Sequence, residues 1–146
     1  MKQLDFDLGL EEYRLNGKVT VHFNPTDAGF LEKLAETYEK LDALQEQVSK
    51  KGAEIRSEKE LFPFAKELDG KMRFILDGLF GVPVCEELFG AMNLFSSAGG
   101  LPVWANLMLA VTEEVEAALQ GEMEKREARI AKYTEKYKVQ SEKFKV

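Results

Sequence analysis

The 146-residue sequence contains one cysteine, Cys85, and one histidine, His22. A single cysteine excludes an intrachain disulfide scaffold and favours a reducing compartment. Metal sites and nucleophilic catalysis both need several such side chains at defined spacings, and neither residue has a spaced partner in the sequence. Adjacent carboxylates such as Glu86 and Glu87 point in different directions on a helix and make no acid–base pair. We therefore predict no catalytic residue, no metal site and no cofactor.

Long apolar runs and glycine-rich phosphate loops are also missing. The longest apolar stretch, residues 101–111, contains Pro102 and Asn106, and it falls well short of the ~20 residues that span a bilayer. The N-terminus lacks the apolar core of a signal peptide, and no glycine spacing fits a nucleotide-binding loop. These absences predict a cytoplasmic protein that has no membrane partner.

The charge is acidic overall but unevenly distributed. The sequence has 26 acidic and 20 basic residues, which gives a net charge of −6. Residues 122–146 hold 8 of the basic and 5 of the acidic residues, so this end carries +3 and residues 1–121 carry −9. An acidic body is a poor ligand for phosphate backbones, so we expect no nucleic-acid partner. The basic end is either a solvated helix or a segment that contacts an acidic surface.

Residues 4–23 show the alternation of strands. Apolar side chains occupy alternate positions from Leu4 to Leu10 and from Val19 to Phe23, and Asn16-Gly17 favours a tight hairpin turn. This pattern predicts a β-hairpin region of two to three strands. Because so small a sheet is marginal alone, it should pack on helices.

Residues 26–119 follow the period of helices instead. Apolar residues at three- and four-residue steps predict helices over 28–51, from about 57 to 80, and over 101–119. With a further short helix after Pro83, they predict a mainly α (α+β) fold in which the hairpin packs on a bundle of about four helices. No linker divides the chain, so we expect one domain over 1–146.

Two segments are candidates for partner binding. Apolar residues are dense between Phe80 and Phe95 although the segment is rich in turns, and they belong either to the core or to an exposed patch. Residues 120–146 predict a long charged helix with a thin apolar stripe, either projecting or docked on a partner. The candidate residues are Phe80, Val82, Leu88, Phe89, Met92, Leu94, Phe95, Ile130, Tyr133 and Tyr137.

The order of motifs along the chain resembles a known family. These motifs are Glu12-Tyr13-Arg14-Leu15-Asn16-Gly17, Phe23-Asn24-Pro25-Thr26-Asp27, Phe80-Gly81-Val82-Pro83-Val84-Cys85, Leu88-Phe89-Gly90, Met92-Asn93, Gly100-Leu101-Pro102-Val103-Trp104 and Lys132-Tyr133-Thr134-Glu135-Lys136-Tyr137. Together they are similar to the tail assembly chaperones of siphophages and prophages of Gram-positive bacteria, over nearly the whole chain. The motifs carry no chemistry of their own.

The resemblance implies a non-enzymatic assembly factor in the cytoplasm of the bacterial host. Such chaperones are thought to coat the long, aggregation-prone tape measure protein while tail tube subunits polymerise around it. The implied partners are the tape measure protein, the tail tube protein as a second candidate, and further copies of the chain. Two alternatives stay open: a structural minor tail or head–tail joining subunit retained in the virion, and a small enzyme.

Overall fold

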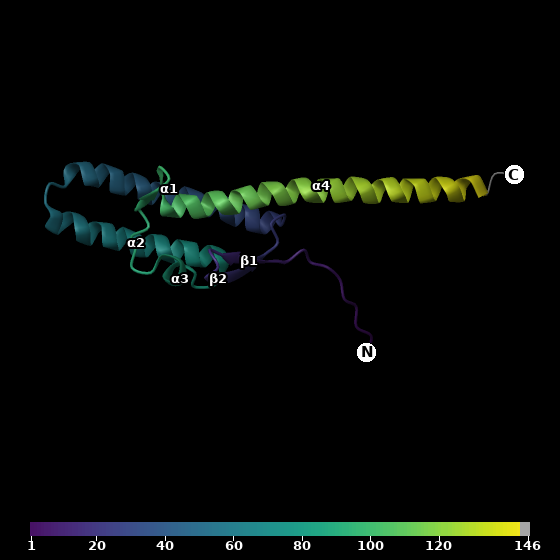
Figure 1. The fold of residues 1–146 in the computed structure, drawn as a ribbon, viewed down its shortest axis with the longest axis horizontal. Coiled ribbons are helices and arrows are strands. Elements are labelled where there is room, and N and C mark those ends of the chain that lie inside the picture. The colour runs from purple at the N-terminus through teal and green to yellow at the C-terminus, as the bar shows by residue number, and fades with distance from the viewer. Residues whose placement is uncertain (144–146) are drawn as a thin grey trace.

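The protein is an elongated, mainly helical molecule with a small sheet near the middle of its length (Figure 1). A computed structural model describes residues 1–143, without the side chains of Tyr137 and of residues 139–143. The elements follow the order β1 (Glu11–Leu15), β2 (Val19–Phe23), α1 (Ala28–Glu54), α2 (Glu58–Phe80), α3 (Cys85–Phe89), β3 (Ser97–Ala98), β4 (Leu101–Pro102) and α4 (Val103–Lys143). The predicted class, a hairpin packed on about four helices with a long last helix, is confirmed.

The hairpin is shorter than the sequence predicts. β1 and β2 pair antiparallel, with Tyr13 opposite Val21, around a turn in which Asn16 and Gly17 both have positive φ. The expected strand over residues 4–10 is wrong, because this segment forms no ladder and its apolar side chains are exposed. Gly9 has a φ of +70°, which turns the chain away before it can pair alongside β1.

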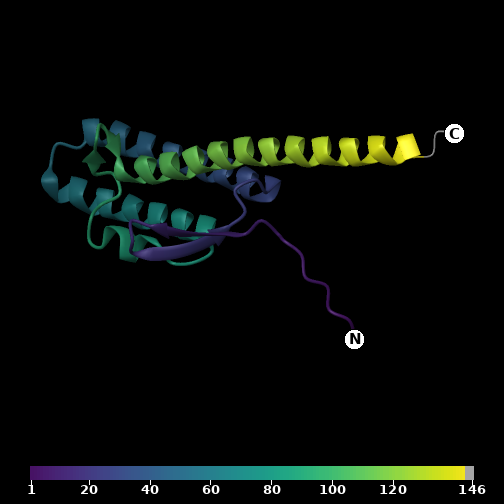
Figure 2. The same cartoon turned by 45° about the vertical axis from the view of Figure 1, so that its right-hand side comes forward.

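Helices α1 and α2 form an antiparallel hairpin (Figures 1 and 2). The Asp27 side chain accepts a hydrogen bond from the Gly29 amide, which caps α1. The helix runs past Gly52, where the sequence suggested that it would stop, and ends at Glu54. Ser57 stands at the N-terminus of α2, but its side chain makes no capping hydrogen bond. The Gly81 backbone, at φ +72°, ends α2.

The core lies where the hairpin, α1, α2 and the first turns of α4 meet. Phe23 stacks on Tyr13 on one side and on Phe30 on the other, with ring centroids 4.5 and 4.3 Å apart. Trp104, buried at the start of α4, donates from its ring nitrogen to the Gln45 side chain of α1 at 2.8 Å. Further core residues are Leu41, Leu68, Met72, Leu76, Leu94, Met108, Val111 and Val115.

Helix α4 is continuous from the core to the far end of the described chain. Its buried stripe ends at Val115, and exposed apolar residues follow at Leu119, Met123, Ile130 and Tyr133. Figures 1 and 2 show its second half extending past the hairpin, on the side where the N-terminal segment also leaves. Residues 120–143 therefore project, and residues 144–146 of the expected helix lie outside the described part of the chain.

Candidate functional site

A pocket of 530 Å³ opens between the end of β1, the α3 region and the beginning of α4. Most of its wall is apolar, and the Arg14 guanidinium and the amides of Asn16 and Asn106 supply polar groups. The remaining lining residues are Leu15, Leu88, Phe89, Met92, Ala98, Val103, Leu107 and Ala110. Three of the predicted partner-binding residues, Leu88, Phe89 and Met92, therefore meet in one place.

The position of α3 is set by one carboxylate of α2. A single oxygen of Asp77 accepts hydrogen bonds from the backbone amides of Val84 and Cys85, at 2.9 and 3.0 Å. These amides are the free donors at the start of α3, so Asp77 caps a helix that it does not belong to. The five residues of α3 could not fix their own position, and this cap holds Leu88 and Phe89 against the pocket.

The loop after α3 is attached to α2 by a partly buried ion pair. Arg73 donates to Asp69 at 2.9 Å, and the pair is 22% and 14% exposed at the side chains. A second guanidinium nitrogen of Arg73 donates to the carbonyls of Gly90 and Met92, both at 2.7 Å. The other oxygen of Asp69 accepts the Leu94 amide, also at 2.7 Å. All these groups are satisfied, so the loop that carries Met92 has a defined conformation.

The other predicted residues of the Phe80–Phe95 segment differ in their surroundings. Leu94 is fully buried, which corrects the prediction that it contacts a partner: the Asp69 hydrogen bond draws its backbone inward. Phe80 and Phe95 are partly buried against the core, and Phe80 lies beside Phe23 with centroids 6.4 Å apart. Val82 is 40% exposed but does not line the pocket.

The remaining predicted residues belong to the projecting half of α4. Ile130 and Tyr133 are 57% and 72% exposed and lie far along the helix from the pocket. The side chain of Tyr137 lies outside the described part of the chain. The structure therefore separates the expected partner residues into a pocket and a helix surface.

Sequence reasoning missed most of the pocket wall. Arg14, Leu15 and Asn16 belong to the hairpin end, and Val103 and Leu107 belong to a helix that the sequence marked as core. Their approach to Phe89 depends on how the hairpin and α4 pack, which no local pattern encodes. The Asn16-Gly17 signal was present, but it predicted a turn and carried no information about the turn's neighbours.

Cys85 lies behind the pocket and is 1% exposed. Burial, and secondarily the nearby Asp77 carboxylate, raises the pKa of its thiol to about 12. A buried, protonated thiol of this kind packs as a small apolar residue. In the part of the chain that the structure describes, no three His, Cys, Asp or Glu side chains are grouped as a metal site requires, and no helix is long and apolar enough to cross a membrane.

No family model matches the chain. No curated protein and no solved structure matches it either. The functional interpretation therefore rests on the resemblance in motif order and on the pocket and surfaces described above.

Proposed function

We propose that the protein is a non-enzymatic tail assembly chaperone that binds an apolar helical segment of a tape measure protein in the host cytoplasm. The pocket between β1, α3 and α4 is the observation that carries this proposal. It exposes Met92 at 50% and gathers Leu88, Phe89 and Leu107 around an opening. A hollow of this size with apolar walls accommodates several side chains from one face of an amphipathic helix.

The polar groups of the pocket define its occupant further. Arg14 is the cation of the wall, so a carboxylate that flanks the apolar face of the bound helix would meet its guanidinium. The amides of Asn16 and Asn106 can hydrogen-bond polar groups at the edge of the same face, although Asn106 also donates to the Ala98 carbonyl at 2.9 Å. The proposed ligand is therefore an amphipathic helix with acidic residues next to its apolar stripe.

A rigid pocket suits this role for an energetic reason. The Asp77 cap and the Arg73–Asp69 pair hold the α3 region in place before any partner arrives. Binding then costs little ordering of the chaperone, and the free energy of apolar burial goes into affinity. The chaperone then covers the apolar face of a tape measure segment that would aggregate alone.

Co-expression tests this proposal directly. The chain produced together with the tape measure protein encoded beside it should keep that protein soluble and co-purify with it. Insoluble tape measure protein in the presence of the chain, with no complex, would overturn the proposal. Mass spectrometry of purified particles is the second test, because a chaperone leaves the finished virion, whereas a minor tail or head–tail joining subunit remains in it.

A further inference from the structure

The first ten residues form an exposed arm. Figure 1 shows them leaving the hairpin in extended form, and they contain no helix or strand. Four large apolar side chains alternate along this arm, and all are well exposed: Leu4, Phe6, Leu8 and Leu10 at 86, 78, 61 and 62%. Asp5 and Asp7 lie between them. A contiguous exposed row of this kind indicates a binding element.

A specific joint at Gly9 sets the direction of the arm. Gly9 has a φ of +70°, and a Cβ at this position would lie 2.7 Å from the side-chain nitrogen of Asn24. That nitrogen donates to the Leu8 carbonyl at 2.9 Å, while the Gly9 amide donates to the Asp7 carboxylate at 2.8 Å. Only glycine fits here. The arm therefore leaves the body at a defined angle.

The projecting half of α4 carries chemistry complementary to the arm. Met123, Ile130 and Tyr133 form an exposed apolar stripe at seven- and three-residue spacing. A basic stripe runs next to it at four-, three- and four-residue steps. It consists of Lys125, Arg129, Lys132 and Lys136. The apolar face of the arm thus matches the apolar stripe, and Asp5 and Asp7, which point to the opposite face, reach the basic stripe along the edge of the contact.

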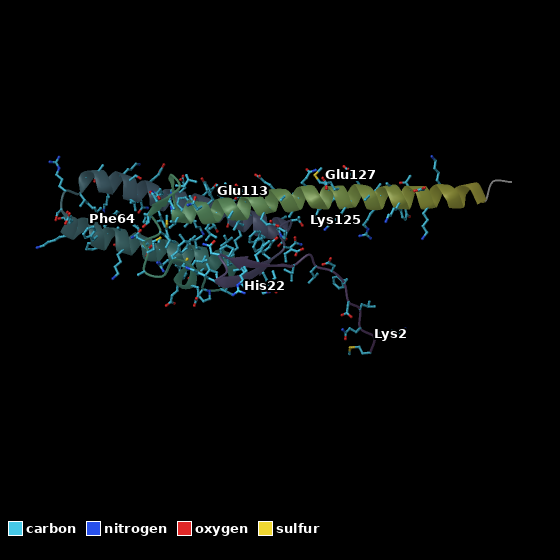
Figure 3. All side chains as sticks on the ribbon, in the orientation of Figure 1. Lys2, His22, Phe64, Glu113, Lys125 and Glu127 are labelled. Carbon is cyan, nitrogen blue, oxygen red and sulfur yellow. The ribbon has the colours of Figure 1, made fainter. Side chains whose placement is uncertain are left out.

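The arm does not cover the helix of its own chain. Asp7 borders one hollow with Lys125, Arg129 and Ile130, but no ion pair joins the arm to this helix among the described residues. Beyond that point the arm and α4 diverge in both orientations of the ribbon, and Figure 3 shows Lys2 far from Lys125 and Glu127 (Figures 1–3). The complementary surfaces are thus present on one molecule but not joined within it.

We propose that a second copy of the chain joins them, with each arm lying along the projecting helix of the other. Both elements leave the same end of the molecule, so one two-fold axis at this end satisfies two arm–helix contacts at once. Residues 4–8 span about 14 Å when extended, and residues 125–136 rise about 17 Å along a helix, so the arm can lie along most of the basic stripe. This dimer can form whether or not the pocket holds a tape measure segment.

Direct pairing of the two projecting helices is the less favourable arrangement. Arg126 lies on the apolar stripe between Met123 and Ile130. Two stripes packed together would bury part of this guanidinium, because Glu122 and Glu127 lie beside the stripe and not on it. The arm instead brings two carboxylates, Asp5 and Asp7, which are about 7 Å apart along an extended chain. This separation is close to the ~6 Å rise between helix residues four positions apart, such as Lys125 and Arg129. The charges on the two copies therefore favour the arm.

Light scattering on the full chain tests the dimer, with charge-reversed variants to identify its surfaces. Wild type should be a dimer whose dissociation constant rises with salt. Neutralising the arm in Asp5→Asn/Asp7→Asn should raise that constant about tenfold. Asp5→Lys/Asp7→Lys and Lys125→Glu/Arg129→Glu should each be monomeric alone, and their mixture should recover the dimer. Because these side chains are exposed, circular dichroism should show unchanged helix content.

Three results would overturn the proposal. The first is a wild-type chain that stays monomeric at all concentrations, and the second is a dimer that survives deletion of residues 2–8. The third comes from cysteine pairs, for which the proposal predicts that a chain carrying Phe6→Cys, mixed with a chain carrying Ile130→Cys, forms an intermolecular disulfide. A Phe6→Cys/Ile130→Cys chain that instead closes only within itself would show that the arm folds onto its own helix.

Discussion

The hydroxyl of Tyr13 donates a 2.9 Å hydrogen bond to the carboxylate of Glu114, which joins β1 to α4 across 101 positions of sequence. Both residues line a second, polar hollow, and Arg14 and Leu15, next to Tyr13 in β1, line the apolar pocket. The hydrogen bond therefore fixes the distance between the hairpin and the helix that form two walls of the proposed binding site. Burial, together with the Glu114 hydrogen bond and charge, raises the pKa of Tyr13 above its ordinary value.

Tyr13→Phe should remove this hydrogen bond while keeping the ring stacked on Phe23. The contact is partly buried, so we expect a loss of about 1 kcal/mol in the free energy of unfolding. Urea denaturation followed by circular dichroism measures this loss. A variant as stable as the wild type would show that the hairpin is held by apolar packing alone.

Tyr13 should also make the stability of the protein depend on pH in the alkaline range. The pKa of Tyr13 is raised in the folded state, so the folded protein holds the phenol proton more tightly than the unfolded chain does. The contribution is fully present below the unfolded pKa of about 10 and is lost as the pH rises above it. The stability difference between wild type and Tyr13→Phe should therefore shrink above that pH. A difference that stays constant would contradict the assigned pKa shift.

Asp69 and Arg73 should be essential for the loop that carries Met92. Asp69→Ala leaves the Leu94 amide and the Arg73 guanidinium without their acceptor, in a place where side chains are mostly buried. We expect a loss of about 2–3 kcal/mol in stability. Lys71→Ala is the matched control, since its pair with Glu67 has the same spacing on α2 but is exposed, and it should cost less than about 0.5 kcal/mol. Similar losses in both variants would refute the role given to the buried pair.

Cys85 should be unreactive in the folded protein. With its pKa raised from 9.0 to about 12, the thiolate fraction near neutral pH falls roughly a thousandfold. A thiol reagent should therefore label wild type only slowly until urea unfolds it. Val82→Cys places a thiol nearby at an exposed position and should react at once. Rapid labelling of Cys85 in the native protein would show that the α3 region opens readily.

The elements with strong apolar periodicity could be predicted from the sequence. The prediction failed where contacts between residues distant in sequence determine the structure. The helices of residues 28–54 and 58–80 follow from apolar spacing and from breaks at either end. The alternation in residues 4–10 is that of a strand, yet no pairing edge adjoins it in the monomer, and Gly9 turns it away. A local pattern can show that a strand is favoured but not whether a partner strand is present.

The same distinction explains the candidate site. Apolar density between Phe80 and Phe95 correctly marked the segment that contains Leu88, Phe89 and Met92. It could not separate them from Leu94, because the Asp69 carboxylate that draws the Leu94 backbone inward lies 25 positions earlier. The pocket-lining residues of the hairpin and α4 could not be predicted for the same reason. Burial of one residue among apolar neighbours is a tertiary property.

The central claim is that the pocket binds an apolar helix of the tape measure protein, and one matched pair of variants tests it most directly. Met92 lines the pocket and Val82 does not, while both side chains are exposed. Calorimetric titration of a tape measure segment should give a dissociation constant at least about tenfold higher for Met92→Lys than for wild type, because lysine brings a charge into an apolar contact. Val82→Lys should bind as wild type does. Equal affinities for all three proteins, or no binding by wild type, would contradict the account.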